Sequence, residues 1–168
     1  MYSYALPFYE KALDIREKTL PDNHPDLAQS YNNIGALFNA TGEYNKALSY
    51  LQKFLDINKK HLSNDHPDLG HAYNNMGTVY QGMKDYKNAI ENYEKALSIW
   101  NKVLPENHPF LAGCYYNMAW AYRNLKEHVK ALPLFEKSLA IFEISYPANH
   151  PNLLTARQEI ENFKQQTG

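Results

Sequence analysis

The sequence has few of the features that stabilise secreted proteins or anchor proteins in membranes. Its 168 residues include one cysteine, Cys114, so an intramolecular disulfide framework is excluded. We find neither a signal peptide nor an apolar run long enough to cross a bilayer. We therefore expect no membrane association, and the lack of cysteine pairs favours a reducing compartment, the cytoplasm.

Charge of one sign and catalytic motifs are lacking as well. The net charge is −1 and the isoelectric point is near 6.6, whereas nucleic-acid-binding domains carry a strongly basic surface. A phosphate-binding glycine loop, a metalloprotease His-Glu motif and a strained serine turn are all missing. Cys114 has no sequence hint of a neighbouring base and is expected to be inert. We predict that the protein is not an enzyme and carries no catalytic residue and no cofactor.

What the sequence does contain is a repeat of 42 residues. The dipeptide His-Pro recurs four times at that spacing, at His24, His66, His108 and His150, each time after Asn or Asp. Four copies in register indicate an array of units that bury their core between neighbours. Stacking places these histidines about one repeat apart, too far apart to share one ion, so we predict no metal site.

Each unit is predicted to form two helices. The proline of the motif stands where helices tolerate it, in the first turn, and the Asn or Asp before the motif can cap the helix. Apolar residues then recur at helical spacing in both halves of the unit. In the first unit these are Tyr31, Ile34, Gly35 and Phe38, followed by Ala47, Leu48, Leu51, Phe54 and Leu55.

Several single positions carry their own expectations. Gly77 is expected at the close crossing of its two helices, and Gly82 on the open side of the unit. Pro7 and Pro133 share one repeat position, which indicates either a tolerated kink or a late helix start. Trp100, on a second helix, is expected to pack on the convex side.

The large-and-small patterns Tyr31…Gly35…Phe38 and Ala47…Leu51…Phe54 resemble the two helices, A and B, of the tetratricopeptide repeat. The common repeat has about 34 residues. The longer variant found here, with ALDIREKTLPDNHPDLAQSYNNIGALF at residues 12–38, is closely similar to kinesin light chain repeats. The glycine that usually ends helix A is present at Gly42, but Lys84 and Lys126 replace it in the next units.

The resemblance implies an all-α solenoid of eight helices arranged as antiparallel A/B hairpins. We expect one domain over residues 1–168, with a half repeat at each end of three full repeats. The expected boundaries are a half repeat at 1–23, full repeats at 24–65, 66–107 and 108–149, and a terminal capping helix at 150–168.

A binding face follows from helical geometry together with the resemblance. At about 100° per residue, one set of A-helix residues points away from the apolar stripe, and in the family helix A lines the concave groove. The set is nearly uncharged and rich in amides, which both donate and accept hydrogen bonds and so can hold an extended peptide. The predicted peptide-binding residues are Gln29, Asn32, Asn33, His71, Asn74, Asn75, Thr78, Tyr116, Asn117, Trp120, Arg123 and Asn124.

In kinesin light chains the equivalent groove binds short peptides that pair a tryptophan with acidic residues. Basic residues that would favour an acidic peptide are scarce here, since only Arg123 is well placed. The competing interpretation is that the amides bond neighbouring side chains and that Trp120 packs against the adjacent repeat.

The sequence thus predicts a protein–protein interaction module or scaffold that binds a protein or peptide partner. Its alternatives are a purely structural or oligomerisation solenoid, a regulatory fragment of a larger multidomain protein, and a designed or consensus-derived array. Glu161 and Lys164 stand at packing positions of the last helix and are typical of a solvent-facing cap. Weak self-association is expected through an apolar face of the first helix, formed by Tyr2, Ala5, Phe8, Tyr9 and Ala12.

Overall fold

The computed structural model describes the backbone of residues 2–167, and within that range the side chains of residues 5–151 and 153–165. Over this range the chain forms α-helices and no strand, which confirms the predicted all-α solenoid. The helices are α1 (Tyr2–Thr19), α2 (Pro25–Ala40), α3 (Tyr44–His61), α4 (Pro67–Gly82), α5 (Tyr86–Val103), α6 (Pro109–Asn124), α7 (His128–Ser145) and α8 (Pro151–Thr167). None of the helices in the described range is both long and apolar enough to cross a bilayer.

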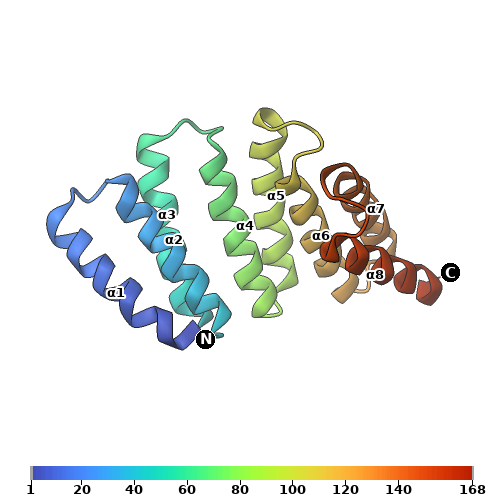
Figure 1. The fold of residues 1–168 in the computed structure, drawn as a ribbon, viewed down its shortest axis with the longest axis horizontal. Helices are drawn as coiled ribbons and strands as arrows, with labels where there is room; N and C mark the ends of the chain where they lie inside the picture. The colour runs from blue at the N-terminus through green and yellow to red at the C-terminus, as the bar shows by residue number, and fades with distance from the viewer. Residues whose placement is uncertain (1, 168) are drawn as a thin grey trace.

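The helices follow one another along the long axis of the molecule in chain order (Figure 1). Helices α2 and α3, α4 and α5, and α6 and α7 form the hairpins, and each hairpin packs on the next. In addition α2 contacts α4 and α4 contacts α6, whereas within residues 2–167 no such contact joins α3 to α5 or α5 to α7. Helices α2, α4 and α6 therefore form the inner layer of the curved stack, and α3, α5 and α7 form its outer layer.

The A helices begin with an unexpected cap. The N-cap residue of α2, α4 and α6 is the histidine of the His-Pro motif: His24, His66 and His108. Its Nδ1 accepts a hydrogen bond from the backbone N–H two residues later, at 3.1–3.2 Å. The prediction that the preceding Asn or Asp caps these helices was wrong, because proline occupies the first helical position and the cap is the residue directly before it.

Small residues allow the two helices of a hairpin to approach closely. A Cβ atom on Gly77 would lie 2.6 Å from Cε1 of Tyr93, so the close crossing lies where it was predicted. The expectation that Gly82 faces open space was wrong, because a Cβ atom there would lie 2.6 Å from Cε1 of Tyr44 in the preceding repeat. Contacts between repeats thus extend to the C-terminal end of α4.

The turn from helix A to helix B uses left-handed backbone in all three repeats. Gly42 has a φ of 81°, and Lys84 and Lys126 take the same conformation with φ of 62° and 63°. The lysines therefore adopt the glycine geometry at a steric cost. Pro7 and Pro133 lie inside α1 and α7, so the alternative of a late helix start is wrong and each helix accommodates its proline.

The two terminal helices differ in the surface they present. Phe8 is 73% exposed and Ile15 is 61% exposed on α1, whereas the Tyr2 side chain lies outside the described residues. On α8, Glu161 is exposed and Lys164 forms an ion pair with Glu136 of α7, at 2.8 Å between Nζ and Oε1. The first helix therefore exposes two large apolar side chains, whereas the last exposes polar side chains at the two positions that were expected to cap the stack.

Candidate functional site

The predicted peptide-binding residues all lie on the inner-layer helices α2, α4 and α6. The clearest link between these helices is an amide pair, in which Asn75 Nδ2 donates to Asn32 Oδ1 at 2.8 Å. Within α2, Gln29 Nε2 donates to Asn33 Oδ1 at 2.9 Å. These amides therefore serve in part as polar partners for one another across and along the inner layer, as the competing interpretation of the sequence proposed.

Other members of the set are also held by partners within the protein. The Thr78 hydroxyl donates to the Asn75 carbonyl oxygen at 2.7 Å, one turn earlier in α4. Asn124 accepts a hydrogen bond from the Tyr86 hydroxyl at 3.1 Å and donates to the Trp120 carbonyl oxygen at 2.8 Å. Asn74 and Asn117 are half-buried on α4 and α6. The inner face is thus polar, largely ordered and only partly open to solvent.

His71 belongs to an aromatic cluster rather than to an open surface. Its ring meets Trp100 edge-on at a centroid distance of 5.1 Å and Phe110 at 4.4 Å. Burial lowers the pKa of His71, opposed by the nearby Asp68 carboxylate and reinforced by His108. Trp100 is 1% exposed and contacts Gly70 and His71 of α4 and Phe110 of α6, so the expectation that it packs on the convex side was wrong.

The part of the inner layer near α8 combines aromatic and charged groups. Trp120 is half-buried and packs edge-on against Tyr116 and Phe135, with centroid distances of 6.4 and 6.2 Å. The Arg123 guanidinium lies over the Trp120 ring, 4.5 Å from its centroid. The Tyr116 hydroxyl donates to a Glu159 carboxylate oxygen of α8. Trp120 and Arg123 therefore form one stacked pair, of which the indole is partly accessible.

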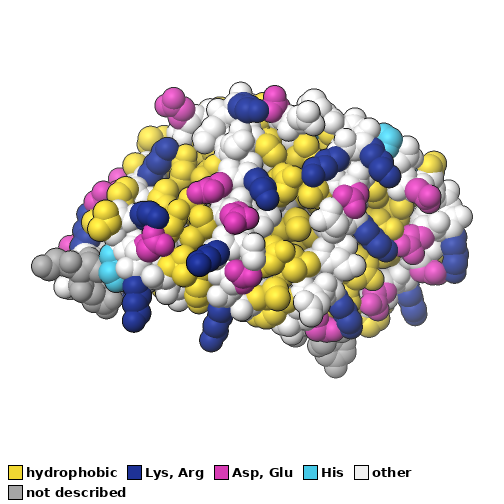
Figure 2. Space-filling view, turned by 180° about the vertical axis from the view of Figure 1, so that it is seen from behind, with side chains coloured by type: hydrophobic (Ala, Val, Ile, Leu, Met, Phe, Trp, Pro, Cys, Tyr) yellow, Lys and Arg dark blue, Asp and Glu magenta, His cyan; other side chains and the backbone are white. Residues whose placement is uncertain are grey.

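Both signs of charge are dispersed over the outside of the molecule. On the face drawn in Figure 2, Lys and Arg side chains are interspersed with Asp and Glu, and hydrophobic side chains lie between them. Close pairs such as Lys102 with Asp65, at 2.7 Å, and Arg157 with Glu143, at 2.8 Å, cancel charge locally. This face therefore offers no extended field of one sign to a charged partner.

The structure gives little support for reactive chemistry. Cys114 is 1% exposed, its thiol donates to the Tyr93 carbonyl oxygen at 3.6 Å, and burial raises the pKa of this thiol. Among the residues that the structure describes, no group of three or more His, Cys, Asp or Glu side chains could hold a metal ion. Reactive cysteines need a stabilised thiolate, which this environment disfavours.

The sequence did not predict a cavity that lies beside the inner-layer helices. A cavity opens between α2, α3 and α4, and one of its walls is formed by Asn58, a residue that helical periodicity does not distinguish from other outer-layer positions. The signal lay in the comparison of repeats, because position 58 corresponds to Trp100 one period later.

Comparison with known proteins agrees with this architecture. The sequence profile described as tetratricopeptide repeat matches residues 4–60 and 68–144. No curated protein matches the sequence. The tetratricopeptide fold is typically a non-catalytic scaffold.

Solved structures with the same fold include chains related to kinesin light chains. A kinesin light chain-type protein of Podosopora anserina with nearly identical TPR-like repeats has a TM-score of 0.76 at 24% identity, covering 98% of this chain and 84% of that one. BtubC (BKLC) from P. vanneervenii has a TM-score of 0.82 at 20% identity, covering 98% of this chain and 65% of that one. The apo form of RapI has a TM-score of 0.75 at 18% identity, covering 98% and 45%. These likenesses confirm the predicted resemblance in fold.

Proposed function

Because this chain belongs to the tetratricopeptide repeat family, we propose that it is a protein-interaction scaffold that holds an extended segment of a partner along its inner layer. The observation that carries this proposal is the contact of α2 with α4 and of α4 with α6, which makes one continuous face of three A helices. Solenoids of this kind use such concave faces for binding.

The side chains of the face favour a partner recognised through its backbone. Asn33, Asn75 and Asn117 recur at one repeat position and are half-buried. Each amide offers a donor and an acceptor, so it can pair with a peptide N–H or C=O whatever the side chains of the peptide are. The partly accessible indole of Trp120 supplies an apolar anchor beside them, of the kind enriched at interfaces.

A selection experiment tests the proposal. Random peptides displayed on phage are selected against the wild-type protein and then scored on two variants. Asn33→Glu/Asn117→Glu changes the inner layer, and the matched control Asn45→Glu/Asn101→Glu makes the same exchange at exposed positions of α3 and α5. We expect selected peptides to lose binding to the first variant and to keep it with the second; equal loss in both variants would refute the inner-layer role.

A second candidate is a structural or oligomerisation solenoid. Two observations favour it: the amides Asn32 and Asn75 bond each other at 2.8 Å, and Phe8 and Ile15 of α1 are strongly exposed apolar side chains. Under this candidate the protein self-associates through α1. Sedimentation velocity of the wild type and of Phe8→Glu/Tyr9→Glu tests this candidate, because only the wild type should form larger species as the concentration rises. If both proteins sediment as monomers at every concentration, self-association through α1 is excluded.

We also propose the domain organisation and the location of the protein. We propose one solenoid domain bounded as the repeat predicts, and a reducing compartment, the cytoplasm, as its location. The lack of a second cysteine supports the latter, because proteins of oxidising compartments are commonly stabilised by disulfides. No metal, cofactor, nucleic acid or membrane partner is part of the proposal.

A further inference from the structure

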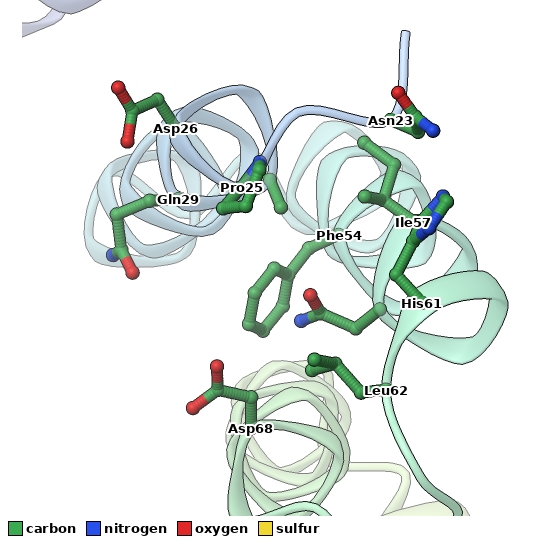
Figure 3. Close-up of a pocket in the computed structure, with 11 residues that line it drawn as sticks. Asn23, Pro25, Asp26, Gln29, Phe54, Ile57, His61, Leu62 and Asp68 are labelled. Atoms are coloured by element: carbon green, nitrogen blue, oxygen red, sulfur yellow. The ribbon is translucent and has the colours of Figure 1, made fainter.

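A cavity of about 300 Å³ lies between α2, α3 and α4, at the end of the inner layer where the A helices begin. Its apolar walls include Pro25, Phe54 and Leu62, and its polar rim includes Asp26, Gln29 and Asp68. Figure 3 shows Asp26 and Gln29 on α2, and Asp68 on α4 below the Phe54 ring, with Ile57 and His61 on the opposite side of the ring from Gln29. The lining of the cavity therefore combines apolar side chains with two carboxylates and the predicted binding residue Gln29.

The wall of this cavity contains a polar group without a partner. Asn58 of α3 lines the cavity and is 6% exposed, and its Nδ2 atom finds no hydrogen-bond acceptor in the part of the chain that the structure describes. A buried amide without a partner is unfavourable, and native proteins seldom leave one unless another group completes it. The cavity thus lacks one hydrogen-bonding group.

The neighbouring units fill the corresponding position with a long, flat N–H donor from the chain itself. One period after Asn58 stands Trp100, whose indole Nε1 donates to the Pro67 carbonyl oxygen at 3.0 Å. One period before it stands Arg16, whose Nη1 donates to the Asp26 carbonyl oxygen at 3.1 Å. Asparagine is much shorter than either side chain, so the space that they occupy elsewhere is left open here.

The charge of the residues around the cavity distinguishes between an aromatic occupant such as Trp100 and a cationic occupant such as Arg16. Where the cavity has Asp68 and Gln29, the next unit has Phe110 and His71, which pack on Trp100. The Asp26 and Asp68 carboxylates remain 64% and 50% exposed, and they lie 4.0 and 3.8 Å from the Nδ1 atoms of their N-cap histidines, atoms that accept backbone hydrogen bonds. An aromatic occupant suits the aromatic rim of the next unit, whereas the two carboxylates among the residues that line this cavity suit a cation.

We propose that this cavity receives an arginine side chain of the protein partner, a step that rests on the proposed function and names one contact within it. The guanidinium is flat, carries five N–H donors and pairs with carboxylates, so it takes the place held by Arg16 and Trp100 in the neighbouring units and neutralises Asp26 and Asp68. Its aliphatic stem packs on Phe54 and Leu62, and the amide of Asn58 completes its hydrogen bonding with the carbonyl oxygen of the bound residue.

The test uses capped arginine, N-acetyl-arginine methylamide, titrated into the isotope-labelled protein and followed by amide NMR. We expect saturable shifts confined to the starts of α2 and α4, the end of α3 and the Asn58 side-chain amide. Capped citrulline, the neutral isostere, should bind about two- to fivefold more weakly, the loss expected for an exposed charge pair. Asp26→Asn/Asp68→Asn should weaken the binding of capped arginine to the same degree, without altering the helical circular dichroism spectrum of the protein.

A second variant fills the cavity with the two residues that the next unit has at the corresponding positions. Trp100 fits because Gly70 faces it, so Asn58→Trp/Ala28→Gly supplies the same pair one period earlier and should abolish the shifts. Equal binding of citrulline, tighter binding of capped tryptophan at this cavity, or the absence of saturable shifts there would overturn the proposal. If displayed peptides still require the inner layer in that case, the proposed function stands and only the arginine contact fails.

Discussion

Replacement of Gly70 by alanine should destabilise the protein, although alanine is the better helix former. Gly70 lies in α4 against the indole of Trp100, and a Cβ atom there would lie 2.3 Å from Nε1 and 2.6 Å from Cε2. Trp100 is 1% exposed and donates to the Pro67 carbonyl oxygen at 3.0 Å, so the ring cannot withdraw without breaking that bond.

The magnitude follows from three opposing effects. Overpacking of a filled core costs about 1–3 kcal/mol, and a broken buried hydrogen bond costs about 1–3 kcal/mol more. Exchange of glycine for alanine inside a helix returns about 0.5–1 kcal/mol. The net result for Gly70→Ala is a loss of about 1–5.5 kcal/mol in the free energy of unfolding.

Gly113→Ala is the matched control, because Gly113 also lies early in an A helix but a Cβ atom there meets nothing within 4 Å. This variant should gain about 0.5–1 kcal/mol. Urea unfolding followed by the fluorescence of Trp100, in a Trp120→Phe background, measures both. Equal stability of the two alanine variants, with unchanged Trp100 emission, would show that the packing of this cluster is misassigned.

Three further predictions concern the turns, the caps and pH. Lys84→Gly should stabilise by about 0.5–1 kcal/mol in urea titrations, because lysine has a φ of 62° there and left-handed backbone costs it about 1–2 kcal/mol; destabilisation would contradict the turn geometry. His66→Ala should cost about 0.5–2 kcal/mol by loss of the cap on α4, and His66→Asn should retain most of that stability; equal melting of the two variants would argue against capping. Since burial lowers the pKa of His71, the unfolded chain binds its proton more readily, and stability should fall as the pH drops below the ordinary histidine value of about 6.5. Urea midpoints at several pH values should show a smaller fall for His71→Phe than for wild type, and an identical fall would exclude His71 as a source.

The architecture could be predicted from the sequence because the same helix signals recur in each repeat, so that a helix boundary that is uncertain in one repeat is supported by the others. Four His-Pro motifs in one register fixed the helix starts, and the small residues at positions such as Gly77 marked the close crossings that the structure contains. The identity of the cap was missed because statistics favour Asn and Asp, while the geometry of proline at the first helical position moves the cap to histidine.

Side-chain roles on the inner layer were harder to predict, since they depend on contacts between repeats. A helical wheel places His71 toward the groove, but the neighbouring Trp100 and Phe110 draw it into an aromatic cluster. Likewise the wheel shows that Asn32 and Asn75 share a face but not that they bond each other. The predicted binding set stays a prediction, and its members divide into packed and accessible groups only once neighbouring helices are present.

The most direct test of the central claim is the footprint of a selected peptide on the protein. Hydrogen–deuterium exchange, measured with and without a saturating displayed peptide, reports protection helix by helix. We expect added protection in α2, α4 and α6, with little change in α3, α5 and α7. Protection concentrated on the outer-layer helices, or restricted to α1, would contradict the assignment of the inner layer as the binding face.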